Sequence, residues 1–366
     1  MGKYIMIGMD VHDRQICVKM AAGRGEVVTR MVENREEGRR ELWEELHRWS
    51  KKAGGAQVVM AYETSGQGYG LHDAAVEEGF TCWVLATTKI ARSPAHRRRK
   101  TDEEDAQRIL EIVRGHVLGG NEIPSVWIPD HKTREDRELV RARLDIADKI
   151  IMVKTQMQTL LKRHEVRKPV SVGTGWTERF VGWLESMTGA ESSLPCGARS
   201  ALATLLRQYE MLNREKRVLD KELQQLAEQP RYQEPVRAMI QVKGVGMLAT
   251  MVMLTDVGDL RRFRNRRQIA AYLGVVPSSS ESGETDDRKG HITHQGPSRV
   301  RRVLCQCVWS RIQHDVDERK AYDRIVGRNP KHAKIAVVAL IRRLAILLWH
   351  LGAEAQMQSG CLAMGI

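Results

Sequence analysis

From about Lys132 the sequence becomes strongly charged and free of glycine, and its apolar residues recur at alternating spacings of four and three. That spacing is the a/d seam of a coiled coil, so we expect a helical coiled-coil region at residues 129–230. Periodicity allows the two seams to pack as a hairpin or to pair between subunits, and it does not decide between them. The first seam comprises Ile146, Ile150, Val153, Met157 and Leu160, and the second Leu205, Tyr209, Leu212, Lys216, Leu219, Leu223 and Leu226.

Short β-rich runs precede this region and alternate with helical ones. Three adjacent strand-like runs come first and helix-connected strands follow, which is typical of an α/β domain. Pro124 and Pro129 bracket its end, so we place this domain at residues 1–128. The expected strands lie at 4–11, 16–21, 27–32, 57–62 and 81–85, and the expected helices at 36–51, 70–78 and 102–114.

Residues 231–366 form the last predicted domain, which we expect to be mainly α-helical. A hydrophobic helix, a Gly-x-Gly turn and another helix predict a helix-hairpin-helix-like element whose turn amides can hold a phosphate. The residues of that turn are Lys243, Gly244 and Gly246. A polar loop is expected at 277–296, followed by helices at 298–314 and 331–351.

Basic residues outnumber acidic ones by 59 to 46, which gives a formal net charge of +13 and a pI near 9.6. This excess favours a polyanionic partner, most often nucleic acid. We expect phosphate contacts from a basic connector and from a later helix start, at Arg97, Arg98, Arg99, Lys100, Arg299, Arg301 and Arg302.

Cysteine usage and hydropathy bear on the compartment. Six scattered cysteines without a CxxC pair argue against a zinc knuckle and against a secreted disulfide framework, so we expect reduced thiols in a cytosol. The most apolar stretch, 335–351, is interrupted by Arg342 and Arg343. We therefore expect no membrane span and no membrane partner.

Four carboxylates stand at the ends of predicted elements. Asp10 and Glu63 each end a strand, and they emerge at one edge of the sheet if those strands are neighbours. Asp102 and Asp105 are three apart, on one face of a predicted helix. Each alone is commonly a strand-end or helix-dipole residue. Together they would repel one another unless cations neutralised them, and oxygen ligation suits Mg²⁺ or Mn²⁺, which clamp phosphate in phosphodiester chemistry.

A serine-rich stretch at 277–284 is followed by the arginines of the later helix start. Serine runs are usually solvent-facing linkers, but this one lies between an apolar helix and those arginines. A serine hydroxyl among arginines and beside a metal can attack a phosphodiester to form a covalent protein–DNA ester. Composition does not select which serine would do so.

Several of these motifs also occur together in one known family. The N-terminal ones are Gly8-Met9-Asp10-Val11-His12, Tyr62-Glu63-Thr64-Ser65-Gly66 and Lys100-Thr101-Asp102-Glu103-Glu104-Asp105-Ala106. The later ones are 240–246, Ala271-Tyr272-Leu273-Gly274-Val275-Val276-Pro277, Ser282-Gly283, Ile292-Thr293-His294-Gln295-Gly296, Arg301-Arg302 and 322–344. In this order, over nearly the whole chain, they resemble the DEDD transposases of the insertion-sequence 110 family.

The resemblance implies a RuvC-like RNase H fold, a coiled-coil insertion and a C-terminal transposase domain. It also implies a recombinase guided by an element-encoded bridge RNA that pairs with donor and target DNA. Its acidic residues, here Asp10, Glu63, Asp102 and Asp105, would bind Mg²⁺. Ser282, which alone in its loop precedes a glycine, would be the nucleophile that forms a 5′-phosphoserine link.

Concerted cutting of several strands requires assembly, so we expect a homodimer that becomes a homotetramer on nucleic acid. The residues expected at its helix contacts are Ile150, Met157, Leu212 and Leu219. We expect it to act in the bacterial cytosol, at the nucleoid. Two other functions remain open: a resolvase-type endonuclease in which water attacks and the serine loop only binds DNA, and a nucleic-acid-binding scaffold without activity.

Overall fold

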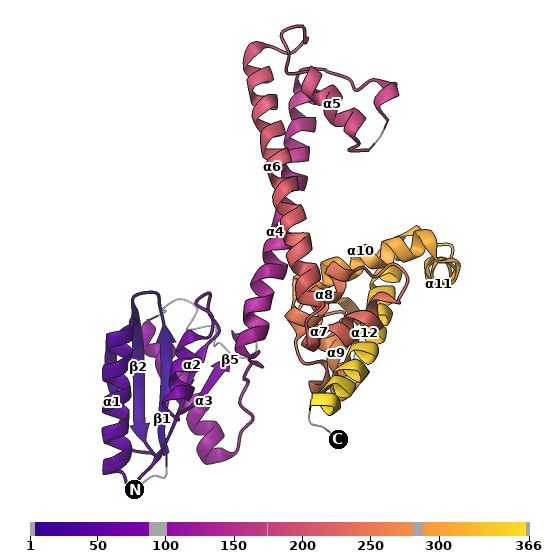
Figure 1. Ribbon diagram of the computed structural model, residues 1–366. Coiled ribbons are helices and arrows are strands. Elements are labelled where there is room, and N and C mark those ends of the chain that lie inside the picture. The colour runs from indigo at the N-terminus through magenta and orange to yellow at the C-terminus, as the bar shows by residue number, and fades with distance from the viewer. Residues whose placement is uncertain (1–3, 88–100, 174, 281–287, 364–366) are drawn as a thin grey trace. The chain divides into compact units, whose positions relative to one another are not determined.

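The computed structural model describes residues 4–87, 101–173, 175–280 and 288–363 (Figure 1). Its contacts divide the chain into two compact units, residues 1–128 and residues 129–366. Five residues of the predicted sites lie outside the described residues: Arg97, Arg98, Arg99, Lys100 and Ser282.

The first unit is built on a mixed five-stranded sheet with the order β3-β2-β1-β4-β5. Strand β2 runs antiparallel to both β1 and β3, whereas β1, β4 and β5 are parallel. This is the RNase H-like arrangement that was predicted, with strand ends shifted by one residue at most. The strands are β1 (Tyr4–Val11), β2 (Gln15–Ala22), β3 (Val28–Glu33), β4 (Gln57–Glu63) and β5 (Thr81–Leu85).

Helices cover this sheet because its central strands are apolar on both faces. Residues 5–9 of β1 are all buried, as expected for a strand between two layers. Helix α1 (Glu36–Lys52) adds Leu42, Trp43 and Leu46 to one core, which α2 (Gly70–Glu77) also joins. Helix α3 (Asp102–Gly119) adds Ile109 and Leu110 to a second core. It continues to Gly119, beyond the predicted end at residue 114.

The second unit begins with two long helices, α4 (His131–Arg163) and α6 (Cys196–Ala227), which lie side by side (Figure 1). The two predicted seams meet within one chain, so the hairpin alternative is the one observed. Ile150, Met157 and Leu212 are buried in this contact, while Leu219 is only partly buried. The connection between the helices contains a 3₁₀ turn, η3 (Val170–Val172), and the short helix α5 (Glu178–Ser186).

The rest of the second unit is a helical domain around one core, as predicted. Three details differ. The expected loop at 277–296 contains an antiparallel ribbon. A further helix, α11, begins after Asp315, whose side chain accepts hydrogen bonds from the amides of Asp317 and Glu318. The last helix continues to Ala363, beyond the predicted end at residue 351. The elements are α7 (Pro230–Ile240), α8 (Met247–Val257), η4 (Leu260–Arg262), α9 (Arg266–Tyr272), β6 (Pro277–Ser280), β7 (Arg288–Ile292), α10 (Ser298–His314), α11 (Val316–Val326), η5 (Pro330–His332) and α12 (Ala333–Ala363).

Helix α12 is long and apolar enough to cross a membrane by length and composition alone. Half of its most apolar window is buried inside the domain, where Leu340, Leu344 and Leu348 line one face at helical spacing. The indole of Trp349 donates a hydrogen bond of 2.9 Å to the Leu260 carbonyl. These contacts are those of the core helix of a folded domain.

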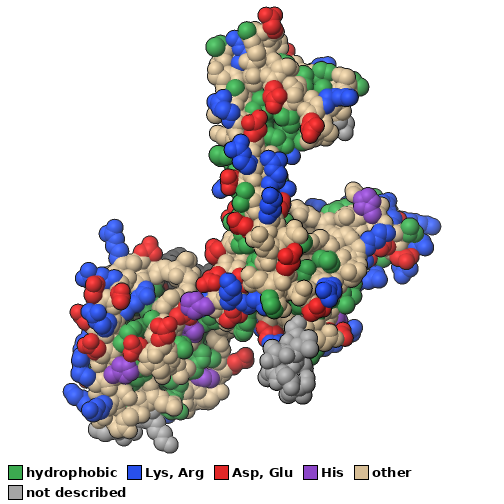
Figure 2. Space-filling view, in the orientation of Figure 1, with side chains coloured by type: hydrophobic (Ala, Val, Ile, Leu, Met, Phe, Trp, Pro, Cys, Tyr) green, Lys and Arg blue, Asp and Glu red, His purple; other side chains and the backbone are tan. Residues whose placement is uncertain are grey.

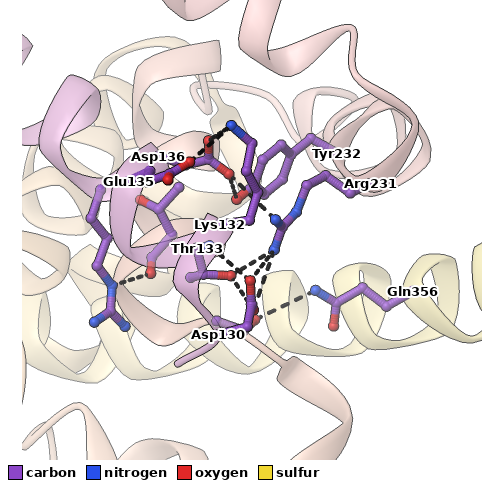
Figure 3. A network of polar contacts seen from close by, with 11 residues as sticks. Asp130, Lys132, Thr133, Glu135, Asp136, Arg231, Tyr232 and Gln356 are labelled. Carbon is purple, nitrogen blue, oxygen red and sulfur yellow. Dashed lines mark hydrogen bonds and ion pairs between the residues drawn. The ribbon is translucent and has the colours of Figure 1, made fainter. Parts of the chain in front are cut away.

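A polar network ties the start of α4 to α7 (Figure 3). The buried Asp136 carboxylate accepts a 2.8 Å hydrogen bond from the Tyr232 hydroxyl, and Arg231 donates to the Thr133 hydroxyl at 2.6 Å. Burial raises the pKa of Tyr232, and the hydrogen bond to Asp136 raises it further, so the hydroxyl stays protonated and donates. The hairpin is thereby fastened to the helical domain at its base.

Candidate active site

The site starts from two neighbouring parallel strands. Met9 of β1 pairs with Tyr62 of β4, so the next residues, Asp10 and Glu63, reach the same edge of the sheet. The two strands are neighbours, so the condition under which both carboxylates emerge at one edge is met. Here the buried apolar run of β1 gives way to polar residues, and the Asp10 side chain is 15% exposed.

Helix α3 brings a second carboxylate to this edge. Thr101 caps the helix by accepting a hydrogen bond from the Glu104 amide, and Asp102 is the first helical residue. The helix can approach β1 this closely because position 8 is glycine. A Cβ there would lie 2.2 Å from the Leu110 nitrogen and 2.3 Å from the Ala106 oxygen. Gly8 thus sets how near Asp102 comes to Asp10.

A histidine joins the two carboxylates. The Nε2 atom of His12 lies 3.1 Å from Oδ2 of Asp10 and 3.2 Å from Oδ1 of Asp102. Ligand atoms of these three residues all lie within 4.8 Å of one another, which makes them a group able to hold a metal ion. Sequence reasoning missed His12 as a ligand. Its position two residues after Asp10 was a partial signal, because the alternation of a strand would place both side chains on one face, but β1 ends at Val11 and His12 belongs to the turn that follows.

The other two predicted ligands lie outside this three-residue group. Asp105 shares the predicted helical face with Asp102, is nearly buried, and forms a 3.1 Å ion pair with Arg108. Glu63 is at the same sheet edge as Asp10. The structure therefore brings Asp10 and Asp102 together, and direct ligation by Glu63 and Asp105 stays a prediction.

A cysteine thiol, that of Cys17, lies near the metal-binding group. Cys17 pairs with Asp10 across β1 and β2. Burial raises the pKa of the Cys17 thiol, and the carboxylates of Glu103, Asp10 and Asp102 raise it further against the opposing effect of Lys19. The free thiol is therefore protonated at neutral pH. Among the described residues, Cys17 is not a member of the three-residue group. The two carboxylates suit Mg²⁺ or Mn²⁺, whereas an imidazole is a donor typical of transition metals, so the set as a whole is able to hold a divalent metal.

A hollow of about 870 Å³ opens beside His12, and Ser65 and Gly66 after β4 also line it. The Asn34 amide fixes this region by donating to the His12 carbonyl at 2.6 Å and to the Gln67 side chain at 2.9 Å. Of the metal-binding group, His12 lines this hollow, whereas Asp10 and Asp102 do not.

Comparison with known proteins decides the family. Residues 7–165 match the family model of DEDD transposases of the IS110 type, and residues 236–324 match the model described as the transposase IS116/IS110/IS902 family. The chain belongs to the IS110 family of transposases.

Curated relatives match this IS110-family chain over two thirds or more of its length. It is 27% identical to the putative transposase y4qE of Sinorhizobium fredii over 82% of this chain and 76% of that protein. It is 22% identical to the transposase for insertion sequence element IS1533 of Leptospira borgpetersenii, over 84% of this chain and 86% of the relative. It is 23% identical to the uncharacterized 43.6 kDa protein of insertion element IS110 from Streptomyces coelicolor, over 68% and 69%.

Membership gives the chemistry of the site. IS110-family transposases carry out phosphoryl transfer on DNA, and their DEDD domain implies a divalent metal. The group of Asp10, His12 and Asp102 lies in the matched region and offers the donors that such a metal requires. The transposase binds DNA as its substrate.

In the second unit, the residues predicted to contact phosphate lie in the turn between α7 and α8 and at the start of α10. The turn at 243–246 joins α7 to α8 as predicted, and Arg311 of α10 braces it by donating to the Lys243 carbonyl at 2.8 Å. A Cβ on Gly244 would lie 2.7 Å from the Arg311 side chain, whereas position 246 has open space. Arg302 forms a 2.5 Å ion pair with Asp148 of α4. Arg299 is half-buried at the start of α10.

Arg301 holds the chain that follows the β6–β7 ribbon. Its guanidinium donates to four backbone carbonyls, those of Leu273, His294, Gln295 and Gly296, at 2.6–3.2 Å. The end of α9 and the chain after β7 are in close contact here, since a Cβ on Gly296 would lie 1.8 Å from the Tyr272 oxygen. The sequence did not predict this positioning role, and contact of Arg301 with phosphate stays a prediction.

Proposed function

We propose that this transposase is an RNA-guided recombinase that cuts and rejoins DNA with a divalent metal and a serine nucleophile. The observation that carries the proposal is the convergence of Asp10, His12 and Asp102 beside an open hollow. When bound, Mg²⁺ or Mn²⁺ would supply positive charge to the scissile phosphate and its leaving oxygen.

The chain's own residues prepare this site. Asp10 and Asp102 provide carboxylate oxygens from two elements that the Gly8 contact holds together. Asn34 fixes the His12 backbone, so the imidazole is directed to both carboxylates. Arg108 compensates the nearly buried charge of Asp105.

The nucleophile that we propose is Ser282, which lies outside the described residues between β6 and β7 in the chain. Its hydroxyl oxygen attacks the phosphorus, the bond from phosphorus to the 3′ oxygen breaks, and the 5′ phosphate stays on the serine. The proton lost by the hydroxyl balances the one gained by the 3′ oxygen. Support comes from Arg301, which holds the chain that follows β7 through hydrogen bonds to the Gln295 and Gly296 carbonyls.

Guidance by an element-encoded RNA and assembly into a dimer, then a tetramer, complete the proposal. The net charge of +13 supports binding to two kinds of nucleic acid at once. Cutting of several strands in concert supports the assembly, which we place in the bacterial cytosol. Light scattering of the protein loaded with RNA and both DNAs tests it, and a persistent monomer would refute it.

Trapping of a covalent adduct tests the nucleophile. The wild-type protein, with metal, RNA and labelled DNA, should give a denaturant-resistant, protease-sensitive protein–DNA species that requires the RNA. Ser282→Ala should bind both nucleic acids and form none, while the matched Ser280→Ala should form it normally.

Each alternative has its own outcome. Cleavage by the wild type without any adduct would favour attack by water, and an adduct retained by Ser282→Ala would move the nucleophile to a neighbouring serine. Cleavage without RNA would contradict guidance, and absence of metal-dependent cleavage would favour the scaffold.

A further inference from the structure

The far end of the α4–α6 hairpin carries a cluster of aromatic rings, although aromatic residues make up only 5% of the chain. Ring centroids of Trp176 and Phe180 are 5.0 Å apart, those of Trp176 and Tyr209 are 5.3 Å apart, and those of Phe180 and Trp183 are 5.5 Å apart. Phe180 is buried, but both tryptophans remain half-exposed. The ammonium of Lys154 lies 4.9 Å from the Trp176 ring centre and helps to hold that ring.

A hollow of about 720 Å³ lies against these rings, a volume within the range of ligand pockets. Trp176, Phe180 and Trp183 line one part of it. The end of α4 and the residues after it line the rest with Lys162, Arg167 and Lys168 against a single carboxylate, that of Glu165. Lys162 and Arg167 are exposed. Hydrophobic, Lys or Arg, and Asp or Glu side chains all lie on the surface of this end of the hairpin (Figure 2).

We infer that this hollow, which we call the tip site, binds an unpaired nucleotide of a single-stranded nucleic acid. The rings of Phe180 and Trp183 are in contact and tilted by 30°, so a base placed on Trp183 would add a further ring to this pair. Aromatic side chains bind bases of any sequence in this way, while cations beside them hold the backbone. Lys162 and Arg167 are placed for that second role. Bases inside a duplex are stacked on their neighbours and are not available to the tip site.

The tip site goes beyond the proposed function and does not depend on it, because it uses neither the metal-binding group nor Ser282. All tests can therefore be run in chelator, where metal-dependent cleavage is absent. Unpaired RNA and unpaired DNA share the chemistry that the site recognises, and the experiment separates them.

The test is ¹⁹F NMR of the full chain labelled with 5-fluorotryptophan, which contains eight tryptophans. Trp176→Phe and Trp183→Phe assign the two tip resonances, and Trp309, which is 45% exposed in the helical domain, is the internal control. The titrants are hexathymidylate, hexauridylate, a DNA duplex and inorganic tripolyphosphate.

Both hexamers should shift the Trp176 and Trp183 resonances, and the duplex and tripolyphosphate should not. A lower dissociation constant for hexauridylate would identify RNA as the source, and a lower one for hexathymidylate would identify DNA. Unchanged tip resonances at saturating hexamer, or an equal response to tripolyphosphate, would overturn the inference.

Affinity provides an independent measurement. Hexamer binding to the tip site is followed by the Trp176 resonance. Trp183→Ala should weaken this binding about 10-fold, the size expected for the loss of one stacked base. Trp309→Ala should not change it. Lys162→Gln combined with Arg167→Gln should flatten the log-log salt slope by about 1.4, at about 0.7 for each phosphate contact on a single strand. A folded Trp183→Ala protein with unchanged tip affinity would overturn the stacking role.

Discussion

Replacement of Gly8 by alanine would force helix α3 away from strand β1. The added Cβ would lie 2.2 Å from the Leu110 nitrogen and 2.3 Å from the Ala106 oxygen. Both are backbone atoms, so no side-chain rotation relieves the clash. Ordinary contact begins at 3.4 Å, so the two elements must separate by about 1.2 Å, the difference between 3.4 Å and 2.2 Å.

Stability and activity should both fall. Overpacking of a tightly packed contact costs about 1–3 kcal/mol, so we expect a loss of about 2 kcal/mol in the free energy of unfolding. Asp102 moves with α3, whereas Asp10 belongs to β1, so the same shift changes the distance between the two carboxylates. A misplacement of about 1 Å can cost on the order of 100-fold in rate, which is the loss that we expect in DNA cleavage.

Urea unfolding followed by circular dichroism and single-turnover cleavage of labelled DNA measure the two effects. The matched control is Gly70→Ala at the first residue of α2, where a Cβ would meet nothing within 4 Å. This control should be neutral or more stable by up to about 1 kcal/mol, and it should cleave DNA at the wild-type rate. Wild-type stability and cleavage in Gly8→Ala would refute the argument that this contact positions the site.

Other perturbations follow from single contacts. His12→Ala should weaken Mn²⁺ binding by at least about 10-fold, measured from free Mn²⁺ by electron paramagnetic resonance, whereas an unchanged affinity would remove His12 from the ligands. Asp220→Ala removes the 2.5 Å partner of the buried Arg143 guanidinium and should lower the free energy of urea unfolding by about 2 kcal/mol. The double variant Asp220→Ala with Arg143→Ala should lose less than the sum of the two single variants. Burial would raise the pKa of Asp130, but the hydrogen bonds from Thr133 together with the charge and hydrogen bond of Arg231 outweigh it, so the pKa is lowered. The stabilising contribution of this carboxylate is therefore present above its unfolded pKa near 4 and is lost as the pH falls through the folded value, so the stability gap to Asp130→Asn should close in acid; a gap independent of pH would contradict this.

Local sequence signals predicted the sheet well because its strands are short apolar runs bounded by turn residues. They failed where tertiary contacts override local preference. Helix α3 contains Gly115 and ends at Gly119, although glycine disfavours helix. The helix continues because it lies along β1 and its Val113 packs into the core. The β6–β7 ribbon was missed because its strands are short and largely polar, so they carry no apolar alternation.

In the candidate site, too, local signals predicted some residues, whereas tertiary contacts decided others. Asp10 and Asp102 were predictable because strand ends and helix starts place side chains in known directions. The role of His12 depends on the turn after β1, where its amide donates to the Gln15 carbonyl at 3.0 Å and turns the chain back. The partners of Arg301 lie 28 and 5–7 residues away, so no local pattern could show that its guanidinium faces carbonyls.

The central claim is that Asp10, His12 and Asp102 hold the catalytic metal. Anomalous diffraction from a crystal soaked in Mn²⁺ locates the ion directly, without reliance on activity. We predict a peak within about 2.3 Å of a carboxylate oxygen of both aspartates and of Nε2 of His12. A peak that the three residues do not contact, with the group itself empty, would contradict the account.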